Sequence, residues 1–386
     1  MSGRWLAAIT VAALAVLAPA PSVLAAADTV TLQASRTELE FGQGTTLSGT
    51  VEPSAPDGST VEIVDAANES VLATSTTTGG QYSVEVVPQA NVDVRASFGQ
   101  ALSQAVGLRV RPRLTARLEG VRLFGSAEVS GRLEPDHPGH SVQVTLLRGD
   151  HVVAREAAPV SGSGYSAEFE ILRSGRYRAK VAFDDADHEA AEIITERRKV
   201  GTPPPLHPGS KGTWVNALEE RLDDLDYHIP RPNRRYDNRT ADAVLAFHKV
   251  QGMNRVRNVS KRTWKRLANP RIPRPRAALP QFHVEIDQSK QVLYVVRDGE
   301  VDDIVHTSTG AGGATRDGVF HVHRKIAGFS PNRLYYPSYF DGTRAVHGWP
   351  EVPSYPASHG CSRVPYWTAK FLFRLMHYGT EVRVYH

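Results

Sequence analysis

Two short stretches near the C-terminus carry the chemistry of this chain: Ala-Val-His-Gly at residues 345–348 and Ser-His-Gly-Cys-Ser-Arg at residues 358–363. Cys361 is the only cysteine among 386 residues, so it forms no disulfide within the chain. A thiol attacks a carbonyl efficiently only as a thiolate, and it therefore needs a base or a cation nearby. With His347 and His359 close in sequence, Cys361 is predicted to be a nucleophile; the alternative is a buried, inert thiol.

A glycine follows each of these histidines: Gly348 follows His347, and Gly360 follows His359. Because glycine has no side chain, the backbone at both positions is expected to approach a substrate closely. The backbone N–H groups of Gly360 and Cys361 are then expected to hold the oxyanion that forms when a carbonyl is attacked.

Further short motifs are spread over residues 281–386. They are Thr307-Ser308-Thr309-Gly310, Asp317-Gly318-Val319-Phe320, His347-Gly348, Ser358-His359-Gly360-Cys361 with Arg363, and Gly379-Thr380-Glu381-Val382. With these motifs the segment resembles the catalytic domain of the L,D-transpeptidase family, the YkuD-like fold. The resemblance implies that Cys361 is the acylated nucleophile, that His347 is the general base, and that the Gly348 carbonyl orients this base.

The resemblance also implies roles for the residues around Cys361. His359 is expected to shape the pocket, and Ser358 and Gly360 are expected to form the oxyanion loop. Arg363 is expected to order this loop or to meet a substrate carboxylate, with a purely structural role as the alternative. Three aromatic side chains are candidates for a substrate-binding wall, with core packing as the alternative: Tyr336, Tyr339 and Trp349.

One segment on the expected substrate side departs from the family pattern. The family often has Thr-Pro-x-Gly before the Val-Phe strand, whereas this chain has Thr315-Arg316-Asp317-Gly318. The departure leaves the predicted chemistry intact and affects the expected detail of substrate binding.

No metal site or cofactor is predicted. His321 and His323 share one face of a predicted strand, as a zinc-binding pair would, but no clear third ligand accompanies them. A transfer that passes through a thioester also needs no ATP, metal or organic cofactor.

Residues 281–386 are expected to form a β-rich domain with one C-terminal helix. Asp298-Gly299 lies between two strand-like runs and predicts a hairpin, because both turn positions tolerate positive φ. Pro365 suits the first turn of the helix, and Gly379 is expected to stop it. The apolar face of this helix is predicted to consist of Trp367, Phe371, Leu372 and Leu375.

Residues 211–270 change to helical periodicity, with apolar residues three and four apart. They are predicted to form a three-helix unit between proline-containing linkers at residues 201–210 and 271–280. The matching residues are Gly209-Ser210-Lys211-Gly212, Val215, Leu218, Leu222, Thr240, Ala243-Val244, Phe247, Thr263-Trp264 and Leu267. On these residues the segment resembles the peptidoglycan-binding domain of cell-wall enzymes, with Glu219 and His248 standing where that family often has glutamine.

This helical segment is basic, which suits an anionic wall polymer. The resemblance implies binding to peptidoglycan glycan. Nucleic acid is the rival partner for a basic patch, and the export signal described below argues against it.

Residues 28–200 contain an internal repeat. Leu47-Ser48-Gly49-Thr50-Val51-Glu52-Pro53 returns as Val129-Ser130-Gly131-Arg132-Leu133-Glu134-Pro135, and Tyr82 is matched by Tyr165. Each copy alternates apolar and polar residues in short runs between turn residues, as β-sandwich strands do. Two immunoglobulin-like sandwiches are therefore predicted, at residues 28–112 and 113–200, as spacers or adhesive modules.

Residues 1–27 have the pattern of a signal peptide. Arg4 precedes an apolar run at residues 5–18, and small residues at positions 25–27 offer a cleavage site. The run is shorter than the roughly 20 residues that span a bilayer, so an exported protein of the cell envelope or cell wall is expected. An uncleaved signal would be its only membrane anchor.

The chain is therefore expected to be multidomain: a signal, two all-β sandwiches, a three-helix unit and a β-rich catalytic domain. Its 41% hydrophobic and 22% charged residues are typical of folded modules. The resemblance implies an L,D-transpeptidase that crosslinks peptidoglycan stem peptides through a cysteine thioester, and carbapenem-type inhibitors would acylate Cys361. A carboxypeptidase or peptidase acting on the same stem peptide, and a catalytically silent wall-binding scaffold, are the alternatives.

Overall fold

The computed structural model describes residues 28–53 and 55–386, so the signal peptide expected at residues 1–27 lies outside the described residues. The chain divides into two compact units. The first runs up to Arg113 and includes Asp184–Ala191; the second comprises Leu114–Phe183 and Glu192–His386. The described parts are β-rich and contain four α-helices, none of which is long and apolar enough to cross a membrane.

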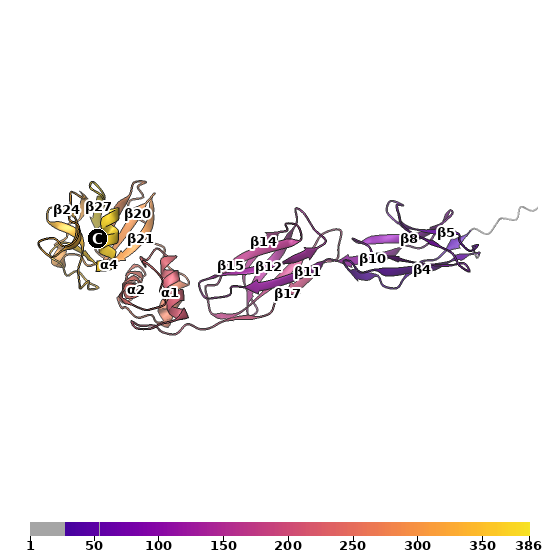
Figure 1. Cartoon of the computed structure of the whole chain (residues 1–386), viewed down its shortest axis with the longest axis horizontal. Helices are drawn as coiled ribbons and strands as arrows, with labels where there is room; N and C mark the ends of the chain where they lie inside the picture. Colours follow the sequence, from indigo (N-terminus) through magenta and orange to yellow (C-terminus); the bar gives the residue numbers. More distant parts are fainter. Residues whose placement is uncertain (1–27, 54) are drawn as a thin grey trace, which may run out of the picture. The chain divides into compact units, whose positions relative to one another are not determined.

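The first unit has two sheets around one core, and Figure 1 labels some of their strands. The four-stranded sheet has the order β1 (Thr29–Val30), β4 (Thr45–Glu52), β2 (Gln33–Ala34), with β7 (Gln81–Val86) also paired to β4. The six-stranded sheet has the order β3 (Glu38–Glu40), β10 (Val106–Arg111), β8 (Val92–Phe98), β5 (Thr60–Asp65), β6 (Val71–Thr76), with β9 (Ala101–Leu102) paired to β8. Leu47 from one sheet and Ile63 and Leu108 from the other are fully buried between them.

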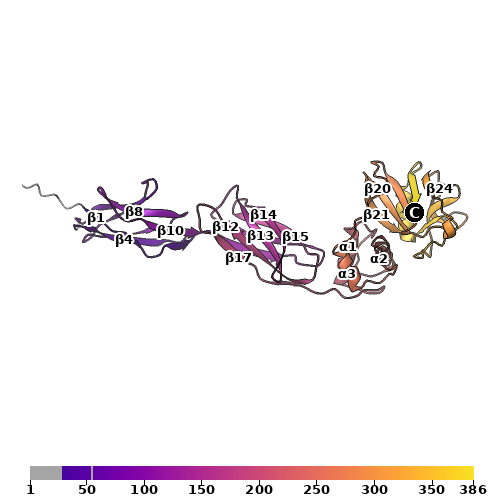
Figure 2. The same cartoon turned by 180° about the vertical axis from the view of Figure 1, so that it is seen from behind.

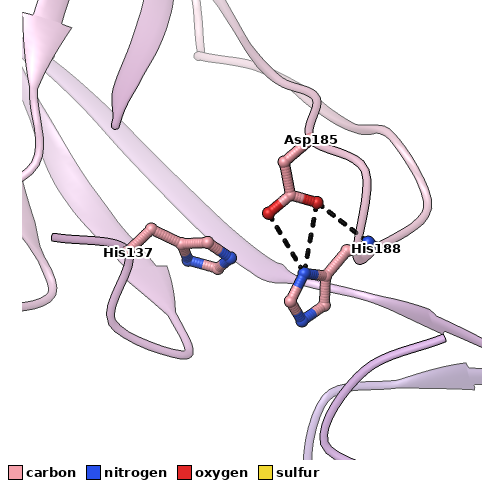
Figure 3. A group of neighbouring side chains, drawn as sticks. All are labelled: His137, Asp185 and His188. Carbon is pink, nitrogen blue, oxygen red and sulfur yellow. Dashed lines mark hydrogen bonds and ion pairs between the residues drawn. The ribbon is translucent and has the colours of Figure 1, made fainter. Parts of the chain in front are cut away.

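The segment Asp184–Ala191 joins the first unit through a compact turn. The backbone N–H of His188 donates to Asp185 Oδ1 over 2.8 Å, and its ring Nδ1 lies 3.2 Å from the same carboxylate (Figure 3). On the other side of the ring, Nε2 lies 3.0 Å from the Gln89 carbonyl oxygen. The Glu189 N–H donates to the Val110 carbonyl, so this turn is fixed to the strands of the first unit.

The second unit begins with two further sheets. The three-stranded sheet has the order β11 (Arg113–Glu119), β12 (Ser126–Glu134), β15 (Gly164–Glu170). The five-stranded sheet has the order β14 (His151–Pro159), β13 (Ser141–Arg148), β16 (Gly175–Phe183), β17 (Ala191–Ile194), with β18 (Arg198–Val200) paired to β16.

Both copies of the internal repeat contain the same contact between a tyrosine, a backbone carbonyl and a glycine. In the first copy the Tyr82 hydroxyl donates to the Thr31 carbonyl, and a Cβ on Gly49 would lie only 1.9 Å from the same oxygen. Glycine is therefore required where the tyrosine crosses to this carbonyl. The second copy repeats the arrangement with Tyr165, Thr115 and Gly131.

Three helices follow: α1 (Thr213–Asp223), α2 (Asn238–Val250) and α3 (Lys261–Leu267), all visible in Figure 2. The Asp237 carboxylate accepts from the first backbone N–H groups of α2, and Ser260 with Thr263 forms a capping box on α3. The helices bury the apolar residues that share one face in the sequence, among them Val215, Leu218, Val244, Phe247 and Leu267.

Glu219 and His248, where the sequence differs from the expected peptidoglycan-binding pattern, are both buried and hydrogen-bonded. Glu219 is 1% exposed; its Oε2 accepts from the backbone N–H groups of Asn233 and Arg234, and its Oε1 accepts from Thr240 Oγ1. His248 Nδ1 donates to a backbone carbonyl, and its Nε2 accepts from the Thr263 hydroxyl. Both side chains therefore act in the architecture of the unit.

We expect Glu219→Ala to destabilise the α1–α2 pair by about 3 kcal/mol, because two backbone N–H groups and the Thr240 hydroxyl lose a buried carboxylate as their acceptor. Glu219→Gln should stay within about 1 kcal/mol of the wild type, since its amide oxygen accepts from both N–H groups and its NH₂ donates to the Thr240 hydroxyl. Hydrogen–deuterium exchange of the α1 and α2 peptides measures this difference. Equal exchange in the two variants would contradict the assigned contacts.

The C-terminal domain has two sheets and one helix around a common core. The five-stranded sheet has the order β21 (Glu300–His306), β20 (Val292–Arg297), β19 (His283–Asp287), β27 (Glu381–Tyr385), β22 (Gly318–His321). The four-stranded sheet has the order β23 (Arg324–Lys325), β24 (Tyr335–Asp341), β25 (Arg344–Gly348), β26 (Ser362–Val364). Helix α4 (Tyr366–Leu375) packs on β24 and β25.

Two local predictions for this domain have clear outcomes. The predicted hairpin is confirmed: Asp298 and Gly299 join β20 to β21, and both have positive φ. The predicted apolar face of α4 is only partly right. Leu372 is buried, and Phe371 and Leu375 are partly buried against the core, whereas Trp367 is half-buried and lines a cavity.

Candidate active site

Two neighbouring parallel strands bring the predicted base and nucleophile to one place. His347 lies on β25 and is paired with Arg363 on β26, and Cys361 immediately precedes β26. Side chains alternate between the two faces of a strand, so a residue two positions before Arg363 is expected on the face that Arg363 shares with His347. The parallel pairing of β25 with β26 therefore brings the backbone of Cys361 next to the strand that carries His347.

His347 is held in one tautomer. Its side chain is buried, with 2% of the residue exposed, and Nδ1 lies 2.9 Å from the Gly348 carbonyl oxygen. A carbonyl only accepts hydrogen bonds, so Nδ1 carries the hydrogen and Nε2 keeps its lone pair. Burial lowers the pKa of His347 to about 4, with Arg363 adding to the decrease and the Gly348 hydrogen bond opposing it. The ring is therefore a neutral proton acceptor near pH 7.

Cys361 is half-buried, which separates it from an inert core thiol. Burial raises the pKa of its thiol, while the Ala345 N–H and the charges of Arg363 and Arg344 oppose this rise. A high thiol pKa beside a low imidazole pKa favours a neutral pair at rest.

Ser358 orders the turn before Cys361. Its Oγ donates to the Cys361 carbonyl over 2.6 Å and accepts from the Gly360 N–H over 3.0 Å. The Gly360 carbonyl in turn accepts from Thr315 Oγ1. The Gly360 N–H was expected to hold an oxyanion, but Ser358 occupies it, so Cys361 N–H is the backbone donor of this pair that remains for that role.

The two glycines serve different purposes. Gly360 has φ +129°, and a Cβ there would lie 2.9 Å from Arg344 Nε, so this turn requires glycine. A Cβ on Gly348 would lie 2.8 Å from the Ala369 Cβ and 2.9 Å from the Tyr366 ring. Helix α4 occupies this space, so the missing side chain of Gly348 permits helix packing and not the approach of a substrate that the sequence suggested.

Only some of the other expected site residues lie next to His347. Trp349 lies edge-on to His347 with ring centroids 5.7 Å apart, and the Arg363 guanidinium lies 5.1 Å from the centroid of the Trp349 ring. His359 is exposed. Of the three candidate aromatic residues, only Trp349 therefore contacts the imidazole.

The remaining two aromatic residues have packing roles. Tyr336 contacts the rings of Tyr335 and Phe373. Tyr339 is buried, with the Arg324 guanidinium 3.7 Å from its ring centroid. Both lie on β24, and these contacts agree with the core-packing alternative, while a part in a substrate-binding wall stays a prediction.

The loop that departs from the family pattern is tethered by charge. Arg316 forms an ion pair with Asp341, and Arg344 joins the same carboxylate over 2.9 Å. The two arginines, Arg316 foremost, lower the pKa of Asp341. Arg344 also donates to the Ala314 carbonyl, so the residues that replace the family's Thr-Pro-x-Gly are connected to the start of the His347 strand.

A cavity of about 490 Å³ lies beside the site, and its walls come from two parts of the chain. Trp349, Arg363 and Tyr366 line it from the catalytic domain, and Asp242 and Arg257 line it from the helical unit. This second contribution could not be predicted from sequence motifs, because more than a hundred residues separate Asp242 from Trp349 and no motif connects them.

Comparison with known proteins identifies the family of the C-terminal domain. The family model YkuD, the L,D-transpeptidase catalytic domain, matches residues 281–384. An L,D-transpeptidase from Xylanimonas cellulosilytica is 35% identical, and the similarity covers 48% of this chain and 99% of that chain, with a TM-score of 0.46. An L,D-transpeptidase from Stackebrandtia nassauensis is 25% identical over 48% of this chain and 98% of that one, with a TM-score of 0.31.

The catalytic domain of an Enterococcus faecium L,D-transpeptidase is 25% identical over 28% of this chain and 100% of that chain, with a TM-score of 0.25. No curated protein matches the chain. The family match falls on the segment that carries Cys361, His347 and their partners. The chain belongs to the L,D-transpeptidase family, with its catalytic domain at residues 281–384.

Proposed function

We propose that this protein is a cell-wall L,D-transpeptidase that crosslinks peptidoglycan through a thioester on Cys361. The observation that carries the proposal is the tautomer of His347. Its Nδ1–H is held by the Gly348 carbonyl, and this leaves Nε2 as a base on the face that it shares with the thiol.

In the first half-reaction, the sulfur of Cys361 attacks the carbonyl that joins the third residue of a stem tetrapeptide to D-alanine, while Nε2 of His347 takes the thiol proton. The oxyanion is held by the Cys361 N–H. The C–N bond then breaks, the imidazolium protonates the amine, and D-alanine leaves. The peptide carbonyl is now bonded to sulfur as a thioester.

In the second half-reaction, the amine of a neighbouring stem peptide attacks the thioester carbonyl and gives a proton to His347. The C–S bond breaks, the thiolate regains this proton, and a 3→3 amide crosslink remains. The energy of the original peptide bond is kept in the thioester, so the residues of this chain suffice for the transfer.

The other modules fit the same setting. We propose that residues 1–27 direct export and that the enzyme works in the cell envelope. The helical unit at residues 211–270 would bind wall glycan, and the repeats at residues 28–112 and 113–200 would act as immunoglobulin-like spacers. The tight Tyr82–Gly49 arrangement and its copy support two equivalent sandwich modules.

Product analysis of the full chain tests the proposal. Incubated with a stem tetrapeptide, the enzyme should release D-alanine, and a second stem peptide should yield a crosslinked dimer by mass spectrometry. Ertapenem, which acylates the catalytic domain of the Enterococcus faecium enzyme, should add its mass to this chain. Release of D-alanine without a dimer would assign a carboxypeptidase, and absence of both the adduct and the release would leave the scaffold reading.

A further inference from the structure

The segment between the two catalytic strands has no regular structure. No helix or strand lies between Gly348 at the end of β25 and Ser362 at the start of β26. This segment begins with Trp349, which contacts His347, and ends with the nucleophile. Its conformation therefore decides where the imidazole, the indole and the thiol lie relative to one another.

Two arginines of the helical unit bind carbonyls of this segment. Arg257 donates to the Val352 carbonyl over 3.2 Å, and its guanidinium is oriented by two hydrogen bonds to Asp242 Oδ1. Arg255 donates to the Ser354 carbonyl over 2.9 Å. Its second terminal nitrogen donates to the carbonyl of Ser289, between β19 and β20. The segment is thus connected both to the helical unit and to the five-stranded sheet.

A buried lysine on α2 adds a third connection. Lys249 Nζ donates to the carbonyls of Gln291 and Thr307 over 2.7 and 3.0 Å and to His306 Nδ1 over 2.6 Å. Because Nδ1 accepts this bond, the hydrogen of His306 is on Nε2, which donates to the Val352 carbonyl over 2.9 Å. The Val352 carbonyl therefore receives donors from both the ring and Arg257.

Further hydrogen bonds connect the Lys249 contacts to β26, the strand that follows Cys361. The hydroxyl of Thr307, whose carbonyl binds Lys249, contacts the Ser362 hydroxyl and donates to the Arg363 carbonyl, each over 2.7 Å. Burial lowers the pKa of Lys249 well below its ordinary value, and a buried amine is stable only where its polar hydrogens have partners. Lys249 meets this condition with three acceptors, and all three belong to the catalytic domain. Nonspecific packing between two domains does not require a buried polar contact of this kind.

We propose that the helical unit is a positioning element of the active site, in which Arg255, Arg257 and Lys249 hold the Trp349–Ser358 segment so that Trp349, His347 and Cys361 are placed for acyl transfer. This inference rests on the proposed function. It gives the helical unit a role in the reaction that is separate from binding wall glycan.

The test uses the full chain with Arg255→Ala, Arg257→Ala and the double variant. Hydrogen–deuterium exchange of the peptide that covers residues 350–358 should increase in the double variant. The rate of acylation at saturating ertapenem should fall about tenfold, since a misplacement of about 1 Å can cost about a hundredfold in rate. Arg255→Lys, which retains one donor for the Ser354 carbonyl, should recover part of the loss.

Arg262→Ala is the matched control, because Arg262 is an exposed arginine on α3 of the same unit. It should leave both the exchange and the acylation rate unchanged. Wild-type exchange and wild-type acylation in the double variant would overturn the inference while leaving the proposed function intact. An unacylated wild type would instead reject the proposed function, and the exchange experiment would still show whether the arginines fix the segment.

Discussion

Cys361→Ser is expected to abolish the ertapenem adduct and the release of D-alanine, with a loss of roughly a thousandfold or more. The serine hydroxyl has nearly the same shape as the thiol, but its proton is far harder to remove. A neutral His347 with a low pKa is a weak base, and it can activate a thiol much more readily than an alcohol. Intact-mass spectrometry of the full chain, with and without ertapenem, measures the outcome.

The variant should fold normally. Cys361 is half-buried, and its sulfur lies 3.9 Å from the Thr343 carbonyl oxygen, a long contact that a hydroxyl group also accommodates. The thermal midpoint by circular dichroism is the control. A stable Cys361→Ser protein that still gains the ertapenem mass would show that another residue is acylated, and the thioester mechanism would have to be abandoned.

His347→Gln is expected to slow acylation of Cys361 by about 10² to 10⁴ at pH 7, the usual contribution of a general base. Glutamine keeps most of the buried volume and can still donate to the Gly348 carbonyl, but its amide does not take a proton. In this variant the rate should rise about tenfold for each pH unit, up to the raised pKa of the Cys361 thiol. The variant then depends on thiolate that forms without a base.

The wild type should show a different pH profile. Because the neutral ring is the active form, acylation decreases as the pH falls through the pKa of His347, which burial lowers to about 4. The rate is therefore expected to stay nearly constant from pH 7 to about 5, where an ordinary histidine with a pKa of about 6.5 would already be protonated.

Stopped-flow fluorescence of ertapenem acylation, with circular dichroism to verify folding at each pH, measures this profile. A decline centred near pH 6.5 would contradict the assigned burial effect. A wild-type rate in His347→Gln would move the role of base to His359, the other histidine beside the thiol.

The sequence predicted those features that depend on residues close together in the chain. The Asp298-Gly299 turn follows from the positive φ that both residues tolerate, and the helical residues from Val215 to Leu267 follow from their spacing. The motifs around His347 and Cys361 were sufficient to indicate the family. Their chemistry, a single thiol with two nearby histidines, is visible without any fold.

Only the tertiary structure decided between residues that look equivalent in the sequence. His347 is buried and oriented by a carbonyl while His359 is exposed, and this difference comes from the packing of β25 between β24 and β26. The Gly360 N–H is occupied because Ser358 turns back toward it.

The contribution of Arg255, Arg257 and Lys249 could not be predicted for the same reason. Their partners are backbone carbonyls far away in the sequence. Every residue has a backbone carbonyl, so the residue type does not indicate which carbonyl is bound. The sequence by itself determined which groups can react and which local elements form. The fold decided which of these groups are desolvated, oriented and joined across domains, because burial and hydrogen bonding depend on segments that meet only in the folded chain.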